Sequence, residues 1–98
     1  MRLVFAAIAL TLAAPALAAP APKVATASFA QLKTPLPLPY DEKADAKAQV
    51  AAARARAKAQ HKLLLIDLGG NWCLDCRLLA ATMELPELRG FLAKHYEI

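Results

Sequence analysis

The chain has 98 residues, of which 58% are hydrophobic, and its formal net charge at pH 7 is +4. This length allows one small domain, and so mild a positive charge does not indicate a nucleic-acid-binding protein. A cluster of basic residues has no aromatic residues among its members and is typical of a solvated helix face. These residues are Arg54, Arg56, Lys58 and Lys62. We therefore expect no nucleic acid among the partners.

Residues 1–18 have the parts of a secretory signal peptide. Arg2 gives a positive start, residues 3–12 are apolar except for Thr11, and a small-x-small cleavage site follows at 16–18. The apolar run is shorter than the ~20 residues of a membrane span. We expect cleavage, no stable membrane insertion of the mature protein, and a periplasmic location, where disulfides persist. An uncleaved amphipathic or apolar anchor is the alternative.

Residues 19–40 are rich in proline and alanine and show no sustained apolar period. The alternating Pro-Leu run at 35–39 favours an extended polyproline II conformation, because proline fixes its own φ and restricts the residue before it. We predict that residues 19–40 are a linker that serves as a spacer. A docking site for a proline-motif partner is the alternative.

Asp41 is predicted to cap a helix that reaches about Gln60. The segment consists mostly of Ala, Lys, Arg and Gln, which are good helix formers. The acidic residues Glu42 and Asp45 lie near its start, where the helix dipole favours negative charge. A narrow apolar stripe predicts that this helix packs on a sheet. The stripe consists of Ala46, Val50, Ala53 and Ala57.

Residues 61–70 are predicted to contain a buried strand that ends in a Gly-Gly loop. Within it, residues 63–66 are four aliphatic residues in a row. Such a run is typical of a central parallel strand that is covered on both faces.

Two helical segments and the start of another strand are predicted after the Gly-Gly loop. The first helix covers the stretch from Arg77 to Met83, and Pro86 suits the first turn of a second helix that ends near Lys94. Residues 95–98 are predicted to begin a strand. The expected fold is therefore α/β, with parallel strands and flanking helices over residues 41–98.

The only two cysteines, Cys73 and Cys76, lie at the predicted strand-to-helix junction, which is the context of a redox motif. A cross-link over two intervening residues closes too small a loop to stabilise the fold much, so redox function explains the pair better. Cys73 is predicted to be the exposed nucleophile, because a helix start favours a thiolate. Cys76, one turn later, is predicted to be more buried and to resolve the mixed disulfide.

Two neighbours of the cysteines are further candidates. Trp72 is predicted to shield the first thiol and to offer an apolar contact to a substrate, with core packing as the alternative. Asp75 places a carboxylate beside the thiols, which opposes thiolate formation.

The combination of Asp67 with Trp72-Cys73-Leu74-Asp75-Cys76 resembles the thioredoxin superfamily. It is most similar to exported thioredoxin-like proteins and to the periplasmic C-terminal domain of the membrane thiol:disulfide interchange protein. The resemblance implies a thioredoxin-like fold over about residues 40–98 and a thiol–disulfide oxidoreductase that acts on protein thiols and disulfides.

The resemblance also implies roles and partners at this site. Asp67 would assist the deprotonation of Cys76, with a turn role at the strand end as the alternative. Catalytic residues would then be Cys73, Cys76, Asp67 and Trp72. We expect no cofactor apart from the redox-active disulfide Cys73–Cys76, and a redox partner that recycles the pair.

The family's fold continues with further strands, a final helix and a loop whose cis-proline faces the cysteines. The 98 residues contain no counterpart of that loop, since Pro86 lies on the wrong side of the second strand. We therefore expect a partial fold, apparently truncated after its first half, and a non-catalytic remnant is one alternative function. A metal-binding Cys-x-x-Cys module is another, but zinc prefers four ligands and only His61 and His95 could add to the thiolates.

Overall fold

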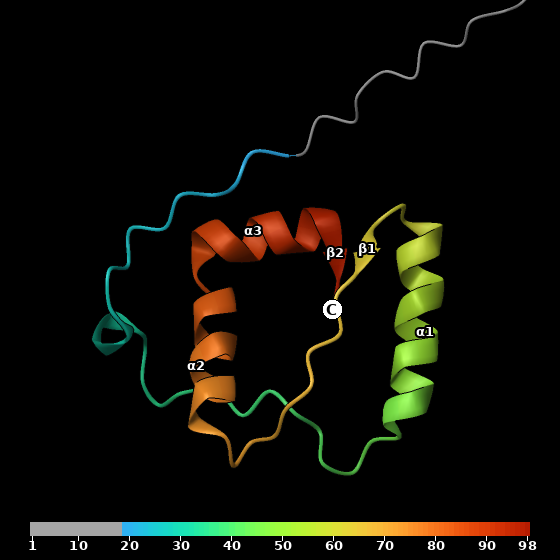
Figure 1. The fold of residues 1–98 in the computed structure, drawn as a ribbon, viewed down its shortest axis with the longest axis horizontal. Helices are drawn as coiled ribbons and strands as arrows, with labels where there is room; N and C mark the ends of the chain where they lie inside the picture. Colours follow the sequence, from blue (N-terminus) through green and yellow to red (C-terminus); the bar gives the residue numbers. More distant parts are fainter. Residues whose placement is uncertain (1–18) are drawn as a thin grey trace, which may run out of the picture.

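The computed structural model describes residues 19–98, and the signal peptide expected over residues 1–18 lies outside the described residues (Figure 1). None of the helices that the structure describes is long and apolar enough to cross a membrane. The elements in chain order are a 3-10 helix η1 (Phe29–Gln31), α1 (Ala46–Ala59), β1 (Leu63–Leu64), α2 (Leu74–Met83), α3 (Pro86–His95) and β2 (Tyr96–Glu97).

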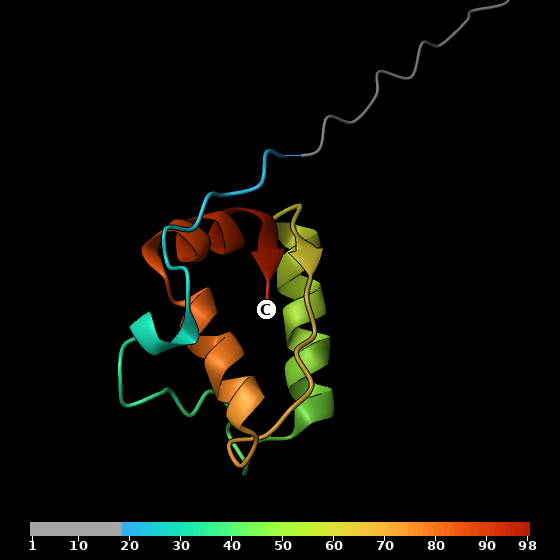
Figure 2. The same ribbon diagram turned by 60° about the vertical axis from the view of Figure 1, so that its left-hand side comes forward.

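The strands β1 and β2 form a parallel two-stranded sheet, in which Leu63 lies opposite Tyr96 and Leu64 opposite Glu97. One more hydrogen bond, from the Leu65 N–H to the Glu97 carbonyl (2.9 Å), extends the pairing. Helices α2 and α3 form the crossover that parallel strands require. Figure 1 shows α1 and α2 on opposite sides of the β1–α2 connection, and in Figure 2 this connection is seen in front of α1. The predicted arrangement of parallel strands with flanking helices is confirmed.

Helix α1 begins later than predicted, because its N-cap is Asp45 rather than Asp41. The Asp45 Oδ1 accepts a hydrogen bond from the Ala48 N–H at 3.1 Å. Asp41 instead closes a turn, in which its carboxylate accepts from the Lys43 N–H (3.0 Å) and its carbonyl from the Ala44 N–H (3.2 Å). Aspartate is suited to both roles, so the sequence alone does not separate them.

The apolar stripe of α1 faces the sheet as predicted. Ala53 and Ala57 are buried, Val50 is half-buried, and α1 contacts both strands, whereas Ala46 at the helix start is exposed. The Arg56 guanidinium, assigned above to a solvated face, forms an ion pair with the Glu97 carboxylate on β2. Arg56 therefore ties α1 to the sheet.

The prediction that the aliphatic run after α1 is buried on both faces is wrong. Leu63 is 65% exposed, Ile66 46% and Leu65 37%. In residues 19–98, β1 has β2 as its single neighbouring strand, and the regular pairing covers two residues of each strand. Much of this aliphatic run is therefore exposed in the described part of the chain.

The buried core is small and consists mainly of alanine. Short side chains allow close approach of the helices, but each buries little apolar area. The buried hydrophobic residues are Leu32, Ala53, Ala57, Ala80 and Ala81. Leu32 belongs to the predicted linker, so that segment contributes to the core.

The last part of the predicted linker is not a free spacer. We refer to residues 36–40 as the docked arm, which passes beside the first turn of α2 (Figure 1). The Arg77 guanidinium on α2 donates hydrogen bonds of 2.9 and 3.1 Å to two backbone carbonyls of this arm. The Asn71 side chain accepts from the Tyr40 N–H (3.0 Å) and donates to the Tyr40 carbonyl (2.7 Å). Two side chains next to the cysteine motif therefore hold the arm in place.

Candidate active site

The two cysteines lie at the start of α2. Cys73 is the N-cap, with extended backbone geometry, and its Sγ accepts a hydrogen bond from the Cys76 N–H at 3.2 Å. The two residues form a disulfide, with their Cα atoms 5.3 Å apart. One helical turn thus brings the two sulfur atoms together at the predicted strand-to-helix junction.

The position of Cys73 favours its thiolate once the disulfide is reduced. The first N–H groups of a helix have no partner within the helix, and the helix dipole adds a partial positive charge at that end. The Cys76 N–H already points at the Cys73 Sγ, so a thiolate at Cys73 would accept a charge-assisted hydrogen bond. Asp75 in the first turn acts against this effect, but its side chain is exposed and water screens its charge.

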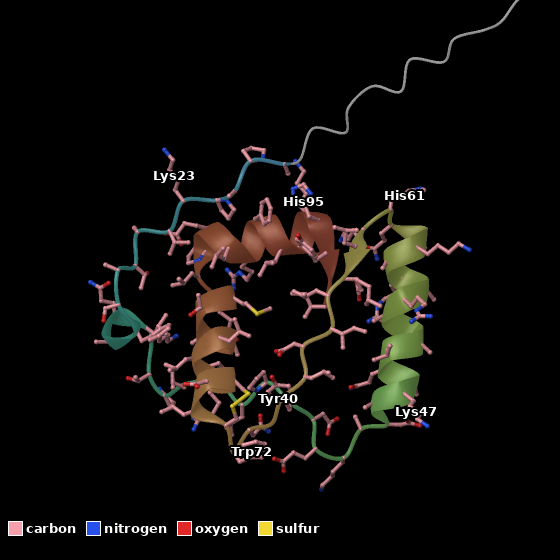
Figure 3. The ribbon with its side chains drawn as sticks, viewed as in Figure 1. Lys23, Tyr40, Lys47, His61, Trp72 and His95 are labelled. Atoms are coloured by element: carbon pink, nitrogen blue, oxygen red, sulfur yellow. A yellow bond between two sulfur atoms is a disulfide. The ribbon has the colours of Figure 1, made fainter. Side chains whose placement is uncertain are left out.

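Trp72 is 86% exposed, so the core-packing alternative for this residue is wrong. The backbone of Gly70 lies directly against its indole ring, because a Cβ atom added at Gly70 would come within 3.0 Å of that ring. Figure 3 shows Trp72 at the end of the molecule where α2 begins. Both cysteines are half-buried, so the disulfide form lacks the exposure difference predicted between them.

Gly69 separates the Cys76 sulfur from an aromatic residue of the docked arm. A Cβ atom added at Gly69 would lie 2.7 Å from the Cys76 Sγ and still closer to the Tyr40 hydroxyl oxygen. Only glycine fits there without moving one of these groups. Tyr40 therefore reaches Cys76 from a distant part of the chain, and Figure 3 shows it beside the disulfide.

Asp67 joins the same cluster through Tyr40. The Tyr40 hydroxyl oxygen is buried and has no hydrogen-bond partner. Burial, followed by the neighbouring Asp67 carboxylate, raises the pKa of Tyr40 above its usual value of 10.0. The structure thus brings together the sequence-predicted residues Asp67 and Cys76, with Tyr40 and Gly69 between them.

We expect Tyr40 to ionise at a higher pH than a tyrosine in the unfolded chain. The raised pKa of Tyr40 means that the folded state keeps a proton which the unfolded state loses near pH 10. The corresponding stability is present below pH 10 and is lost as the pH rises through the folded-state pKa.

The tyrosinate absorbance of a Tyr96→Phe variant measures this titration, because Tyr40 is then the one tyrosine left in the chain. We expect a midpoint above 10.0 in the folded variant and near that value in denaturant. Equal midpoints in the two solvents would contradict the placement of Tyr40.

The sequence did not indicate Tyr40, Asn71 and Arg77 as residues of this site. Tyr40 ends the proline run, and no spacing rule links it to cysteines that lie far along the chain. Asn71 and Arg77 directly flank the Trp-Cys-x-x-Cys motif, which is a weak signal for a supporting role. Their function here is to hold the docked arm through backbone groups, and such contacts leave no pattern in a sequence.

The described residues do not assemble a metal site. In residues 19–98, no three His, Cys, Asp or Glu side chains are grouped so that they could hold one metal ion. The ring of His95 lies against Phe91, with 4.6 Å between the ring centroids. Figure 3 shows His61 and His95 at the end of the molecule away from the disulfide. The metal-binding alternative therefore gains no support.

A family model described as thioredoxin-like matches residues 45–96, which is more than half of the chain. Parallel strands, flanking helices and a Cys-x-x-Cys disulfide at a helix start define the class as a partial thioredoxin-like domain. The chain belongs to the thioredoxin-like family, and the resemblance noted in the sequence is confirmed. Neither the curated proteins nor the solved structures gave a match.

Proposed function

We propose that this protein is a thiol–disulfide oxidoreductase that acts on the thiols and disulfides of other proteins in the periplasm. One observation carries the proposal: Cys73 caps α2 and forms a disulfide with Cys76, whose N–H points at the Cys73 Sγ at 3.2 Å. This geometry stabilises a thiolate at Cys73 and keeps a second sulfur within reach of it. The thioredoxin-like family supports redox chemistry in general.

The exchange has two steps in the reducing direction. The Cys73 thiolate attacks one sulfur of a substrate disulfide, so that a mixed disulfide forms and the other substrate sulfur leaves as a thiolate. The Cys76 thiolate then attacks the Cys73 sulfur, which forms the Cys73–Cys76 disulfide and releases the second substrate thiolate. Two electrons pass to the substrate, and its thiolates take up protons from water. The reverse steps oxidise a substrate dithiol.

Residues around the cysteines support these steps. Trp72 (86% exposed) and Leu74 (60% exposed) offer apolar surface to a substrate chain on either side of Cys73. Asp67 is placed in the cluster that contains the Cys76 sulfur, where a carboxylate can accept the proton that Cys76 must lose. The roles of Trp72 and Asp67 are those predicted from the sequence, and Leu74 is added to them here.

The periplasmic location rests on the signal-like residues 1–18. Each turnover changes the redox state of the Cys73–Cys76 pair. A partner that exchanges two electrons with the pair must therefore restore its starting state before the next turnover. In the reducing direction this partner is a dithiol, and in the oxidising direction it is a disulfide.

Insulin-disulfide reduction by the purified protein tests the proposal, with dithiothreitol as the reductant. We expect the wild type to accelerate the reaction at least about tenfold more than Cys73→Ser, because the nucleophile is lost in that variant. Circular dichroism of both preparations is the control for folding. Equal rates for the two proteins would overturn the proposal and would favour the non-catalytic alternative.

A further inference from the structure

The Tyr40 hydroxyl is the one buried side-chain nitrogen or oxygen in residues 19–98 that lacks a hydrogen-bond partner. The exchange steps described above do not use it. An unpaired buried hydroxyl costs free energy, so proteins rarely leave one without a compensating role. Its location beside the Cys76 sulfur, across Gly69, suggests what that role is.

Hydrogen bonds from two side chains near the cysteines hold Tyr40, the last residue of the docked arm, beside Cys76. The Asn71 amide forms a hydrogen bond with each backbone group of Tyr40, at 2.7 and 3.0 Å. Arg77, the residue after Cys76, donates two hydrogen bonds to the preceding part of the arm. Both donors belong to the segment that carries the cysteines, so the position of Tyr40 is tied to the motif itself.

We propose that Tyr40 is a positioning residue for Cys76, and that its hydroxyl donates a hydrogen bond to the Cys76 sulfur when the cysteine pair is reduced. This inference rests on the proposed thiol–disulfide exchange and names a further residue of that same site. Tyr40 keeps its proton throughout and takes no part in bond making or breaking.

The oxidation state of the cysteines decides whether the Cys76 sulfur is a good acceptor for this hydroxyl. In the disulfide form the Cys76 sulfur is a weak acceptor, and the Tyr40 hydroxyl has no partner at hydrogen-bond distance, although the Asp67 carboxylate lies near enough to raise the pKa of Tyr40. Reduction breaks the sulfur–sulfur bond and frees the Cys76 side chain to turn toward Tyr40. A thiolate there accepts a charge-assisted hydrogen bond, which is stronger than a neutral one.

Both effects of the hydroxyl favour the reduced pair. It makes the oxidised form less stable, because it is unpaired there, and it makes the reduced form more stable, because it is paired there. Tyr40 therefore makes the Cys73–Cys76 pair a better oxidant than it would be with phenylalanine at the same position. A purely structural contact would not distinguish the two redox states, so it would leave this equilibrium unchanged.

The test is equilibration of the full protein with glutathione buffers of stepped thiol-to-disulfide ratio, followed by acid quench, alkylation and mass spectrometry. Two electrons pass from two glutathione thiols to the Cys73–Cys76 disulfide, and glutathione disulfide is formed. We expect Tyr40→Phe to lower the equilibrium constant for reduction about tenfold, which corresponds to a potential about 30 mV more negative. In a Cys73→Ser background, Tyr40→Phe should also move the alkylation of Cys76 to higher pH.

Tyr96→Phe is the matched control, since Tyr96 is the other tyrosine of the chain and lies in β2, away from the cysteines. It should leave the equilibrium constant unchanged. An equilibrium constant for Tyr40→Phe within about twofold of the wild type, or a shift toward the reduced form, would overturn the inference.

A second variant guards against misfolding. Asn71→Ala keeps the hydroxyl but frees the arm, so it should shift the equilibrium in the same direction as Tyr40→Phe, and it decides the matter if Tyr40→Phe does not fold. No shift in a folded Asn71→Ala protein would then overturn the inference. If the equilibrium constant shifts as expected but the wild type does not reduce insulin, only the proposed function is contradicted. If the wild type reduces insulin but the variants show no shift, only the role of Tyr40 is contradicted.

Discussion

Replacement of Cys76 by serine is expected to stop turnover and to trap the substrate on Cys73. The first attack needs only the Cys73 thiolate at the N-cap of α2, and a serine at residue 76 keeps the N–H that points at its sulfur. The second step needs a sulfur nucleophile one turn away, and a serine hydroxyl does not perform it. We expect the insulin-reduction rate to fall more than about hundredfold, as for other groups that act as a unit.

Mass spectrometry under non-reducing conditions checks this result. After exposure to glutathione disulfide, Cys76→Ser should carry one glutathione on Cys73, whereas the wild type should return to its internal disulfide. The control is Cys73→Ser, which should form the corresponding adduct much more slowly, because Cys76 lacks the N-cap position. Adducts that form at equal rates on the two single variants would show that the helix start does not select the nucleophile.

Replacement of Gly69 by alanine is expected to destabilise the folded protein. The added Cβ atom would lie 2.7 Å from the Cys76 Sγ and closer still to the Tyr40 hydroxyl, and Cys76 cannot move far while it is held by the disulfide. Overpacking of this kind costs about 1–3 kcal/mol. For a domain of this size, the melting temperature should fall by on the order of 10 °C.

Gly90→Ala is the matched control, and thermal melts of the oxidised proteins by circular dichroism give the comparison. Gly90 lies inside α3, and a Cβ atom added there meets nothing within 4 Å. Alanine should therefore stabilise the helix by up to about 1 kcal/mol, since glycine is a poor helix former. If Gly69→Ala melted at or above the wild-type temperature, the close contact of Tyr40 with the cysteine motif would be disproved.

The local parts of the fold were predictable because short-range rules govern them. The Cys-x-x-Cys spacing placed two sulfurs on one helical turn, and Pro86 marked the first residue of α3, where its missing N–H costs nothing. The apolar stripe of α1 indicated the face that packs on the sheet. The motif and its junction were also specific enough to reveal the thioredoxin-like family.

The predictions from the sequence were wrong where two local conformations have similar energy, or where burial depends on residues far away in the chain. Asp41 and Asp45 can both cap a helix, and the turn that Asp41 forms with Lys43 decided between them. The aliphatic strand was predicted to be buried, yet Leu63 is 65% exposed. Aliphatic side chains favour burial of a strand, but the strand is buried only where other elements of the fold pack against it.

The sequence by itself determined the chemistry at the start of α2, because an N-cap thiol and its partner one turn later depend only on neighbouring residues. Tertiary structure alone decided that Tyr40 lies beside Cys76 and Asp67, since this contact joins a proline-rich segment to residues that follow it at long range. The hydrogen bonds that hold the arm involve backbone carbonyls and amides, which every residue has. Such contacts carry no residue pattern, so only the folded chain displays them.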